Sequence, residues 1–260
     1  MTTKNYDYLV IGGGSGGMAS ARRAAKHGAR VAVIERGRLG GTCVNVGCVP
    51  KKVMWHAAQL AHGFEDAADY GFRYDGLEHD WLKLKQRRDA FVKRLNGIYA
   101  NNLANDDIDL HDGLASFTGE REVQVNDQTL TAEHILIATG GHPVWPETPG
   151  ASLGIDSDRF FELEQRPQKV AVVGSGYIAV ELAGVLNSLG SEVTMLLRRD
   201  HLLKEFDELL GNHLIELMQA QGVRLLFKTQ AAELKQEGDA VRVVYEDDRE
   251  DEQFDALIWA

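Results

Sequence analysis

A pattern of strand, glycine-rich turn, helix and strand occurs twice in this chain and limits its fold more than any other feature. The first copy runs from Tyr8 to Glu35 and the second from Lys169 to Arg198. Each has the length of a βαβ unit of about 30 residues, in which a helix connects two parallel strands. The copies lie too far apart for a solenoid repeat. The sequence therefore predicts an α/β fold with two Rossmann-like, dinucleotide-binding domains, each built on a parallel sheet.

The first glycine cluster has the spacing of a phosphate-binding turn. Gly12, Gly14 and Gly17 form G-x-G-x-x-G directly between the strand and the helix. The first glycine permits the tight turn, the second lets the backbone approach a diphosphate, and the third lets the helix pack on the strand. The helix N-terminus then favours the anion. Glu35 ends the second strand, where a carboxylate can bind ribose hydroxyls, so this copy predicts a dinucleotide site.

The second cluster has the same spacing but a different strand end. Its three small residues are Gly174, Gly176 and Ala179. Arg198 and Arg199 stand where the first copy has its acid, and a guanidinium there can pair with a 2′-phosphate. This pattern favours NADP over NAD. Two other readings stay open, since the arginines could be solvated surface charges and Asp200 could bind a ribose.

Outside the two copies, the pattern predicts further helices and a region of short strands. Helices are expected over residues 49–69, 81–108 and 209–221. Alternating residues from 113 to 140 predict an antiparallel β-meander with a tight turn at Asn126-Asp127. Further strands are expected near residues 223, 241 and 257.

A cluster of prolines marks a domain boundary. Pro143, Pro146 and Pro149 precede Gly150, and this composition is typical of an interdomain linker. We therefore expect one domain over residues 1–142 and a second over residues 143–260. Residues 254–260 read as one strand in which the sequence stops. The first domain is expected to be incomplete and to continue after residue 260.

Composition and charge exclude several classes of protein. The chain has 39 acidic and 28 basic side chains and a formal net charge of −11, whereas nucleic-acid-binding proteins normally carry a basic surface. No stretch reaches the roughly 20 apolar residues that span a bilayer, and the N-terminal residues lack the pattern of a signal peptide. These features predict a soluble cytoplasmic protein that binds neither nucleic acid nor membrane.

The two cysteines of the chain, Cys43 and Cys48, lie close together in a glycine-flanked segment. If a helix begins near Cys43, the two side chains are about one turn apart and close enough for a disulfide. A helix N-terminus would also lower the pKa of a thiol and favour the attacking thiolate. No second pair of ligands accompanies them, so a structural zinc site is not expected. The alternative of two unrelated buried cysteines remains.

The segment GGTCVNVGCVPKKVMW resembles the redox-active disulfide of the flavoprotein pyridine-nucleotide disulfide oxidoreductases, and most closely that of the glutathione reductases. Lys52 and Met54-Trp55 carry the closer resemblance, because dihydrolipoamide dehydrogenases and mercuric reductases usually have Ser-Lys after the proline. The segments IGGGSGGMASARRAA, ILIATGGHP, GIDSD, VVGSGYIAVELAGVLN and LIWA match family segments in order. The resemblance implies that residues 1–142 bind FAD, that residues 143–260 bind NADPH, and that the reaction is reduction of glutathione disulfide.

The resemblance also implies a role for each catalytic position. Cys43 would attack the disulfide substrate, and Cys48 would lie against the flavin and interact with it by charge transfer. Lys51 and Glu181 would form an ion pair beside the flavin. Tyr177 would be the ring that moves aside when nicotinamide enters.

The binding positions implied by the resemblance fall into three sets. FAD would be held by Gly12, Gly14, Ser15, Gly16, Gly17, Glu35, Thr42, Cys43, Lys51, Ala115, Thr139 and Gly140. NADPH would be held by Gly174, Gly176, Ile178, Ala179, Glu181, Arg198, Arg199 and Lys204, although family members often have arginine at the last position. Substrate would be held by Ser15, Arg22 and Tyr99. A cation at Arg22 favours the anionic glutathione over the cationic trypanothione, while a solvated helix arginine remains the alternative.

Two family features have no counterpart in this sequence. Family members complete FAD binding with a later Gly-Asp segment, and they dimerise through a C-terminal domain that supplies a catalytic acid–base to the partner subunit. We therefore expect the homodimer to belong to a longer protein, and this chain alone to be inactive.

Three alternatives to this function remain: a sister reductase for trypanothione or another bis-thiol, an NAD-linked dihydrolipoamide dehydrogenase, and a non-catalytic dinucleotide-binding fragment.

Overall fold

The chain forms two compact units in a computed structural model that describes residues 3–73, 76 and 78–260. The first unit consists of residues 1–50 and 88–142, and the second of residues 51–87 and 143–260. One division falls at the start of the proline-rich segment, between residues 142 and 143. The second unit also includes residues 51–87, which the sequence pattern places in the first domain.

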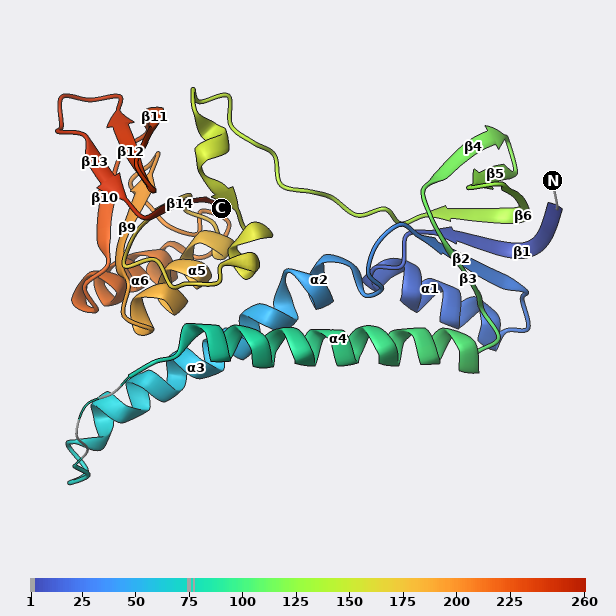
Figure 1. The fold of residues 1–260 in the computed structure, drawn as a ribbon, viewed down its shortest axis with the longest axis horizontal. Helices are drawn as coiled ribbons and strands as arrows, with labels where there is room; N and C mark the ends of the chain where they lie inside the picture. Colours follow the sequence, from blue (N-terminus) through green and yellow to red (C-terminus); the bar gives the residue numbers. More distant parts are fainter. Residues whose placement is uncertain (1–2, 74–75, 77) are drawn as a thin grey trace. The chain divides into compact units, whose positions relative to one another are not determined.

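The first unit is built on a six-stranded sheet with the strand order β3-β2-β1-β6-β5-β4 (Figure 1). Neighbours from β3 to β6 are parallel, whereas β6, β5 and β4 form the antiparallel meander that the sequence predicts. The strands are β1 (Thr3–Ile11), β2 (Val31–Glu35), β3 (Asp109–Asp112), β4 (Ala115–Gly119), β5 (Glu122–Val125) and β6 (Gln128–Ile137). The predicted turn at Asn126-Asp127 joins β5 to β6, whereas β3 was not predicted.

Helix α1 (Ser15–Lys26) packs on β1 and β2 and covers one face of the sheet. Successive side chains of a strand point to opposite faces. Val10, Val31 and Val33 accordingly join the cluster on the α1 side. Leu9 and Ile34 join a second cluster with the meander. The continuous apolar runs of β1 and β2 are thus explained by burial of both faces, as in other parallel sheets.

Helices α3 (Cys48–Ala67) and α4 (Trp81–Asn105) follow the predictions for residues 49–69 and 81–108 closely. The short helix α2 (Gly41–Asn45), which precedes α3, was not predicted as a separate helix. In the described part of the chain, no helix is long and apolar enough to cross a bilayer.

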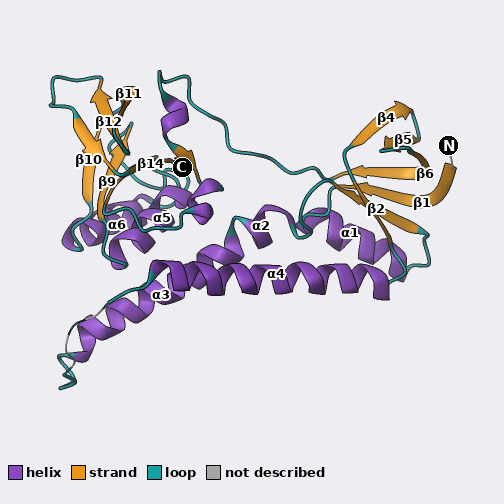
Figure 2. Cartoon of the chain, viewed as in Figure 1, coloured by secondary structure: helices purple, strands orange, loops and turns teal. Residues whose placement is uncertain are grey.

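The second unit combines a parallel sheet, β10-β9-β8-β14-β7, with an antiparallel sheet, β11-β12-β13 (Figure 2). Helix α5 (Tyr177–Ser188) packs on β8 and β9, and α6 (Glu208–Ala220) packs on β10. The strands are β7 (Ile155–Asp156), β8 (Lys169–Val173), β9 (Glu192–Leu197), β10 (Arg224–Phe227), β11 (Ala231–Glu237), β12 (Ala240–Tyr245), β13 (Glu252–Phe254) and β14 (Ala256–Trp259). Short 3₁₀ turns occupy Ala151–Leu153 and Arg159–Glu162. The two units together confirm the α/β class with parallel sheets and antiparallel strands.

The prediction of one strand over residues 254–260 was wrong. Phe254 pairs with β12 in the antiparallel sheet, whereas β14 pairs with β7 and β8 in the parallel one. The chain changes sheets at Asp255, whose carboxylate accepts hydrogen bonds from the backbone N–H groups of Gln168 and Lys169 at 2.8 and 2.9 Å. The acidic Asp255, which interrupts an apolar run, thus marks in the sequence the point where the chain passes from one sheet to the other.

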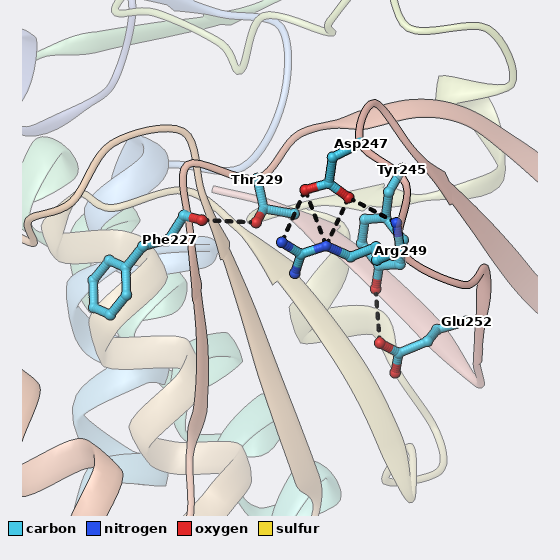
Figure 3. A network of polar contacts seen from close by, with 6 residues as sticks. All are labelled: Phe227, Thr229, Tyr245, Asp247, Arg249 and Glu252. Atoms are coloured by element: carbon cyan, nitrogen blue, oxygen red, sulfur yellow. Dashed lines mark hydrogen bonds and ion pairs between the residues drawn. The ribbon is translucent and has the colours of Figure 1, made fainter.

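Polar contacts hold the loop between β12 and β13 (Figure 3). Arg249 donates to both carboxylate oxygens of Asp247, at 2.8 and 3.1 Å, and its guanidinium lies 5.4 Å from the ring centroid of Tyr245. The Tyr245 hydroxyl donates to Glu252 at 3.2 Å. Burial and the charge of Glu252 raise the pKa of Tyr245, so its hydroxyl stays a donor at physiological pH. These contacts close a hairpin and belong to the scaffold.

The proline-rich segment ends in an anchored turn. Gly150 has a φ of +75°, and a Cβ built on it would lie 2.1 Å from the carbonyl oxygen of Leu234 in β11. The backbone N–H of Leu234 donates to the carbonyl of Pro149 at 2.8 Å. The linker therefore enters the second unit at a position where only glycine fits.

Candidate functional site

The first glycine turn is packed so closely that two of its glycines cannot carry a side chain. Gly12 has a φ of +110°, and a Cβ there would lie 2.3 Å from the carbonyl oxygen of Ala138 and 3.2 Å from the Cα of Thr139. A Cβ on Gly17 would lie 1.9 Å from the carbonyl oxygen of Gly12. The end of β6 therefore lies against the turn, which places Thr139 beside Gly12.

Replacing Gly17 by alanine is expected to destabilise the first unit by about 1–3 kcal/mol, because the new methyl group meets backbone that must move. Gly16→Ala is the matched control, since a Cβ at Gly16 meets nothing within 4 Å. Urea unfolding of both variants measures the difference. Equal stability of the two variants would show that the turn tolerates the extra methyl group.

The helices that follow the two glycine clusters both begin without a side-chain cap. Gly14 precedes α1 and Gly176 precedes α5, and neither glycine has a side chain that could accept from the first backbone N–H groups. Helix α6 differs, because the Asp207 carboxylate accepts from the N–H of Leu209 at 2.9 Å. Uncapped N–H groups at a helix N-terminus suit a diphosphate. Both turns therefore fit a dinucleotide.

The carboxylate of Glu35 lies at the first turn, where the sequence predicts a ribose contact. It accepts hydrogen bonds from the backbone N–H groups of Gly13 at 2.7 Å and Gly37 at 2.8 Å. Each bond goes to a different oxygen, so both oxygens keep a lone pair for a hydroxyl donor. Glu35 can thus order the turn and bind a ribose at the same time.

The two cysteines do not share one helix, contrary to the expectation of a helix that begins near Cys43. Cys43 lies in the short helix α2, which ends at Asn45, and Cys48 is the first residue of α3. A Cβ on Gly47 would lie 2.9 Å from the carbonyl oxygen of Thr42. The chain folds back on itself at this glycine, and this close turn brings the thiols together in place of the predicted helical spacing.

Two asparagines that the sequence reading missed hold the segment before Cys43. The side-chain nitrogen of the buried Asn45 donates to the carbonyls of Leu39 and Gly41, at 3.1 and 2.9 Å. Asn96 of α4 donates to the Leu39 carbonyl at 2.8 Å and to the side-chain oxygen of Asn45 at 3.0 Å. Buried amides with several backbone partners rigidify a loop. Sequence spacing could not predict this contact, because Asn45 and Asn96 lie 51 positions apart in the chain.

Cys43 and Cys48 are free thiols in contact with each other. The pKa of the Cys43 thiol is raised, chiefly by its hydrogen bond with Cys48 and further by partial burial, while a hydrogen bond with Ser15 acts in the opposite direction. The expectation that a helix N-terminus lowers this pKa was wrong for Cys43 in the dithiol form. The hydrogen bond with the neighbouring Cys48 sulfur has a larger effect on the pKa of Cys43 than the short helix α2. A thiol that shares its proton with a second sulfur loses that proton with more difficulty, so its pKa rises.

Site-resolved alkylation is expected to show this shift. The thiolate is the reactive form, so alkylation of Cys43 in the dithiol chain should rise with pH around a midpoint above the ordinary thiol value. In Cys48→Ser the main cause of the raised pKa is gone, and the midpoint should move to lower pH. Mass spectrometry after brief alkylation at a series of pH values measures both. An unchanged midpoint would mean that Cys48 does not control the proton of Cys43.

Lys51 and Glu181 form the ion pair that the resemblance implies. The Lys51 Nζ lies 2.5 Å from Oε1 of Glu181, and both side chains are partly exposed. They come from α3 and α5 of the second unit. A second contact between these helices joins His62 Nε2 to Ser188 Oγ at 2.9 Å. Two polar contacts thus hold α3 along α5, and Lys51 is placed by this packing.

The second glycine turn resembles the first in its packing. Gly174 has a φ of +145°, and a Cβ there would lie 1.8 Å from the carbonyl oxygen of Ala260 and 3.3 Å from the Cβ of Ala179. Ala179 is buried and Ile178 is half-buried, whereas the Tyr177 side chain is 62% exposed. The ring expected to meet nicotinamide therefore stands free at the start of α5.

Arg198 and Arg199 follow the last residue of β9 and are exposed. Neither forms an ion pair within the described residues. Asp200 has partners on both oxygens, His201 Nδ1 at 3.2 Å and Lys228 Nζ at 3.6 Å. The hydrogen bond with His201, a backbone hydrogen bond and the charge of Lys228 lower the pKa of Asp200. Arg198 and Arg199 are thus available to bind an anion. Asp200, the acid that could instead bind a ribose, is already paired with His201 and Lys228.

Lys204 lies in a loop that returns to the glycine turn. The backbone N–H of Leu203 donates to the Ser175 carbonyl at 2.8 Å, and the Lys204 Nζ lies 3.2 Å from the carboxylate of Glu205. This surface pair is weak, so Lys204 can exchange it for a phosphate.

The three residues expected at the substrate line one pocket of about 400 Å³ in the first unit. Its lining is Ser15, Met18, Ala19, Arg22, Arg23, Lys26 and Tyr99. Arg22 donates from Nε to Oδ2 of Asp106 at 2.5 Å, a partner that the sequence pattern did not indicate. Because Ser15 also hydrogen-bonds the Cys43 thiol, the pocket adjoins the Cys43 sulfur.

The remaining predicted positions have less distinctive surroundings. Thr42 is exposed on α2, Ala115 is half-buried in β4, and Gly140 has a φ of +70° after β6. Their assignment to FAD stays a prediction. Among the described residues, no three or more His, Cys, Asp and Glu side chains are grouped so that they could hold a metal ion.

Comparisons with known proteins agree with this geometry. A family profile described as "Pyridine nucleotide-disulphide oxidoreductase" matches residues 6–260. Glutathione reductase of Schizosaccharomyces pombe is 48% identical over 272 aligned positions, which cover 99% of this chain and 58% of that protein. A solved structure, the Cu(II) complex of the HOCl-induced flavoprotein disulfide reductase RclA from Escherichia coli, has a TM-score of 0.86 and 29% identity, covering 99% of this chain and 56% of that one. The chain therefore spans little more than half the length of these relatives.

Proposed function

Because this chain belongs to the pyridine nucleotide-disulphide oxidoreductase family, which implies binding of FAD and a nicotinamide dinucleotide, we propose that it performs the NADPH-dependent reduction of glutathione disulfide as part of a longer protein. The observation that carries the proposal is the contact among Cys43, Cys48 and Ser15 beside the pocket that Arg22 and Tyr99 line. This contact places the dithiol next to a pocket that is lined by cationic side chains.

The dithiol performs the exchange in two steps. The Cys43 thiolate attacks one sulfur of glutathione disulfide, forms a mixed disulfide and releases the first glutathione thiolate. The Cys48 thiolate then attacks the Cys43 sulfur, releases the second glutathione and leaves a Cys43–Cys48 disulfide. Two electrons pass from the protein to the substrate, and the two thiol protons end on the two glutathione molecules. When bound, FAD and NADPH supply the two electrons that restore the dithiol.

Residues of both units hold the cofactors in this proposal. The uncapped N-termini of α1 and α5 bind the two diphosphates, and Glu35 binds a ribose. Lys51, which is paired with Glu181, provides a positive charge for the flavin. Tyr177 covers the nicotinamide position until the nucleotide enters. Arg198 with Lys204 selects NADPH through its 2′-phosphate.

A homodimer and a cytoplasmic location complete the proposal. The acid–base that protonates the leaving thiol would come from the partner subunit, as the resemblance implies. The low cysteine content and the thiol pair suit a reducing compartment.

The purified protein tests the proposal directly. We expect flavin absorbance, NADPH oxidation with glutathione disulfide, and much slower oxidation with trypanothione disulfide, lipoamide or NADH. A preference for NADH with lipoamide would replace the proposal by a dihydrolipoamide dehydrogenase. A colourless protein that binds NADPH but leaves glutathione disulfide intact would support a dinucleotide-binding module.

A further inference from the structure

Cys43 lies in a loop whose two ends are joined by one side chain. This stretch, residues 39–45, is named the Cys43 loop, and it includes α2. Asn45, the last residue of α2, donates from Nδ2 to the carbonyls of Leu39 and Gly41 at 3.1 and 2.9 Å. Asn45 is only 9% exposed, so water does not readily replace these bonds. An amide at its base therefore closes the Cys43 loop.

The backbone of the first glycine turn gives the Cys43 loop a second attachment. The N–H of Gly40 donates to the carbonyl of Gly13 at 2.8 Å. A Cβ on Gly41 would lie 2.7 Å from the Cα of Gly14, so the two backbones are in direct contact. Gly40 and Gly41 have φ values of +99° and +60°, which side-chain-bearing residues rarely adopt. This attachment therefore needs no side chain at all.

Asn96 supplies a third attachment from α4. Its Nδ2 donates to the carbonyl of Leu39 at 2.8 Å and to Oδ1 of Asn45 at 3.0 Å. One amide of a neighbouring helix thus holds both ends of the Cys43 loop. Within the described part of the chain, neither Asn45 nor Asn96 hydrogen-bonds a thiol. Asn96 can therefore influence Cys43 only by fixing the loop that carries it.

We propose that Asn96 is a positioning residue for the dithiol, because it holds the Cys43 loop in the arrangement in which Cys43 and Cys48 form a disulfide with each other. The inference deepens the proposed function and rests on it only in taking this pair as the redox-active one. Two groups that the protein already holds in place react with each other at a much smaller entropic cost than mobile groups. Releasing the Cys43 loop should therefore weaken the disulfide relative to the dithiol.

The equilibrium between dithiol and disulfide tests the inference without NADPH or glutathione. The purified chain is equilibrated with mixtures of reduced and oxidised dithiothreitol. Cys43 and Cys48 give up two protons and two electrons and form an S–S bond, while the S–S bond of oxidised dithiothreitol opens to its dithiol. Acid quenching, alkylation and mass spectrometry count the thiols that remain. The measured quantity is the equilibrium constant for disulfide formation relative to dithiothreitol.

Asn96→Leu is expected to lower this constant about threefold to tenfold, the effect of losing one hydrogen bond that favours the ordered loop. Leucine has nearly the size of asparagine but no donor. Asn96→Ser should lower the constant in the same direction and serves if leucine disturbs folding. Asn101→Leu is the matched control, because it makes the same substitution at an exposed asparagine of the same helix. It should leave the constant unchanged.

Two further comparisons separate positioning from general stability. Tyr8→Phe removes the hydrogen bond between the Tyr8 hydroxyl and Ser20 Oγ, 2.7 Å apart, which joins β1 to α1 in the same unit. Urea unfolding should show a loss of stability for Tyr8→Phe and for Asn96→Leu, but only Asn96→Leu should change the equilibrium constant. In an Asn45→Ser background, Asn96→Leu should have a smaller effect on the constant, because one of the groups that Asn96 holds is gone.

Three results would overturn the inference. An unchanged constant in a folded Asn96 variant would mean that the loop needs no support from α4. An equal decrease in Tyr8→Phe would mean that the constant follows overall stability. An undiminished effect of Asn96→Leu in the Asn45→Ser background would mean that Asn96 does not act through the amide of Asn45. The proposed function fails separately, when the constant responds as expected but the protein does not oxidise NADPH with glutathione disulfide.

Discussion

Replacing Cys48 by serine is expected to abolish NADPH-dependent reduction of glutathione disulfide, with kcat falling at least about a thousandfold. Cys43 can still attack the substrate, but a serine hydroxyl cannot displace glutathione from the mixed disulfide. The proposed division of labour rests on the Cys43 side chain, which is hydrogen-bonded to Cys48 and to Ser15 of the pocket that Arg22 and Tyr99 line. Steady-state oxidation of NADPH measures the loss.

A single turnover separates the roles of the two thiols. Cys48→Ser should release one glutathione and retain the other on Cys43, where mass spectrometry detects it. Cys43→Ser should neither turn over nor form this adduct. NADPH affinity is the control, since its proposed site lies in the second unit and should be the same in both variants. Continued turnover of Cys48→Ser would refute the resolving role of Cys48.

Replacing Arg198 by leucine is expected to raise the KM for NADPH about 10- to 100-fold while changing the KM for NADH less than about twofold. The expected size is that of one or two charge-assisted hydrogen bonds to a phosphate. The structure places Arg198 at the end of β9, exposed and without an ion pair among the described residues. NADH lacks the 2′-phosphate, so its binding should not depend on this guanidinium.

Arg159→Leu is the matched control for this comparison. Arg159 is an exposed arginine of the same unit, in the 3₁₀ turn after the edge strand β7. It should leave both KM values unchanged. Equal effects of Arg198→Leu on NADPH and NADH would mean that Arg198 does not contact the phosphate.

Local patterns predicted the scaffold of both units. The spacing of Gly12, Gly14 and Gly17 between an apolar strand and an amphipathic helix predicted a βαβ unit, and β1, α1 and β2 form one. The second copy, from Lys169 to Arg198, likewise forms a βαβ unit from β8, α5 and β9. Such patterns succeed because strand period, helix period and turn chemistry depend on neighbours in the sequence. Strands β3, β7, β11 and β13 were missed, because short or polar strands form only where a sheet edge accepts them.

The sequence by itself determined which residue types stand at the site: two thiols five positions apart, two glycine clusters, and arginines at the end of a strand. Only the tertiary structure decided how they are used. It paired Lys51 with Glu181, 130 positions away, and Arg22 with Asp106, 84 positions away. It also raised the pKa of Cys43 by setting Cys48 against it across a break between two helices. The physical reason is that charge and proton affinity depend on neighbours in space, which packing selects and local spacing does not specify.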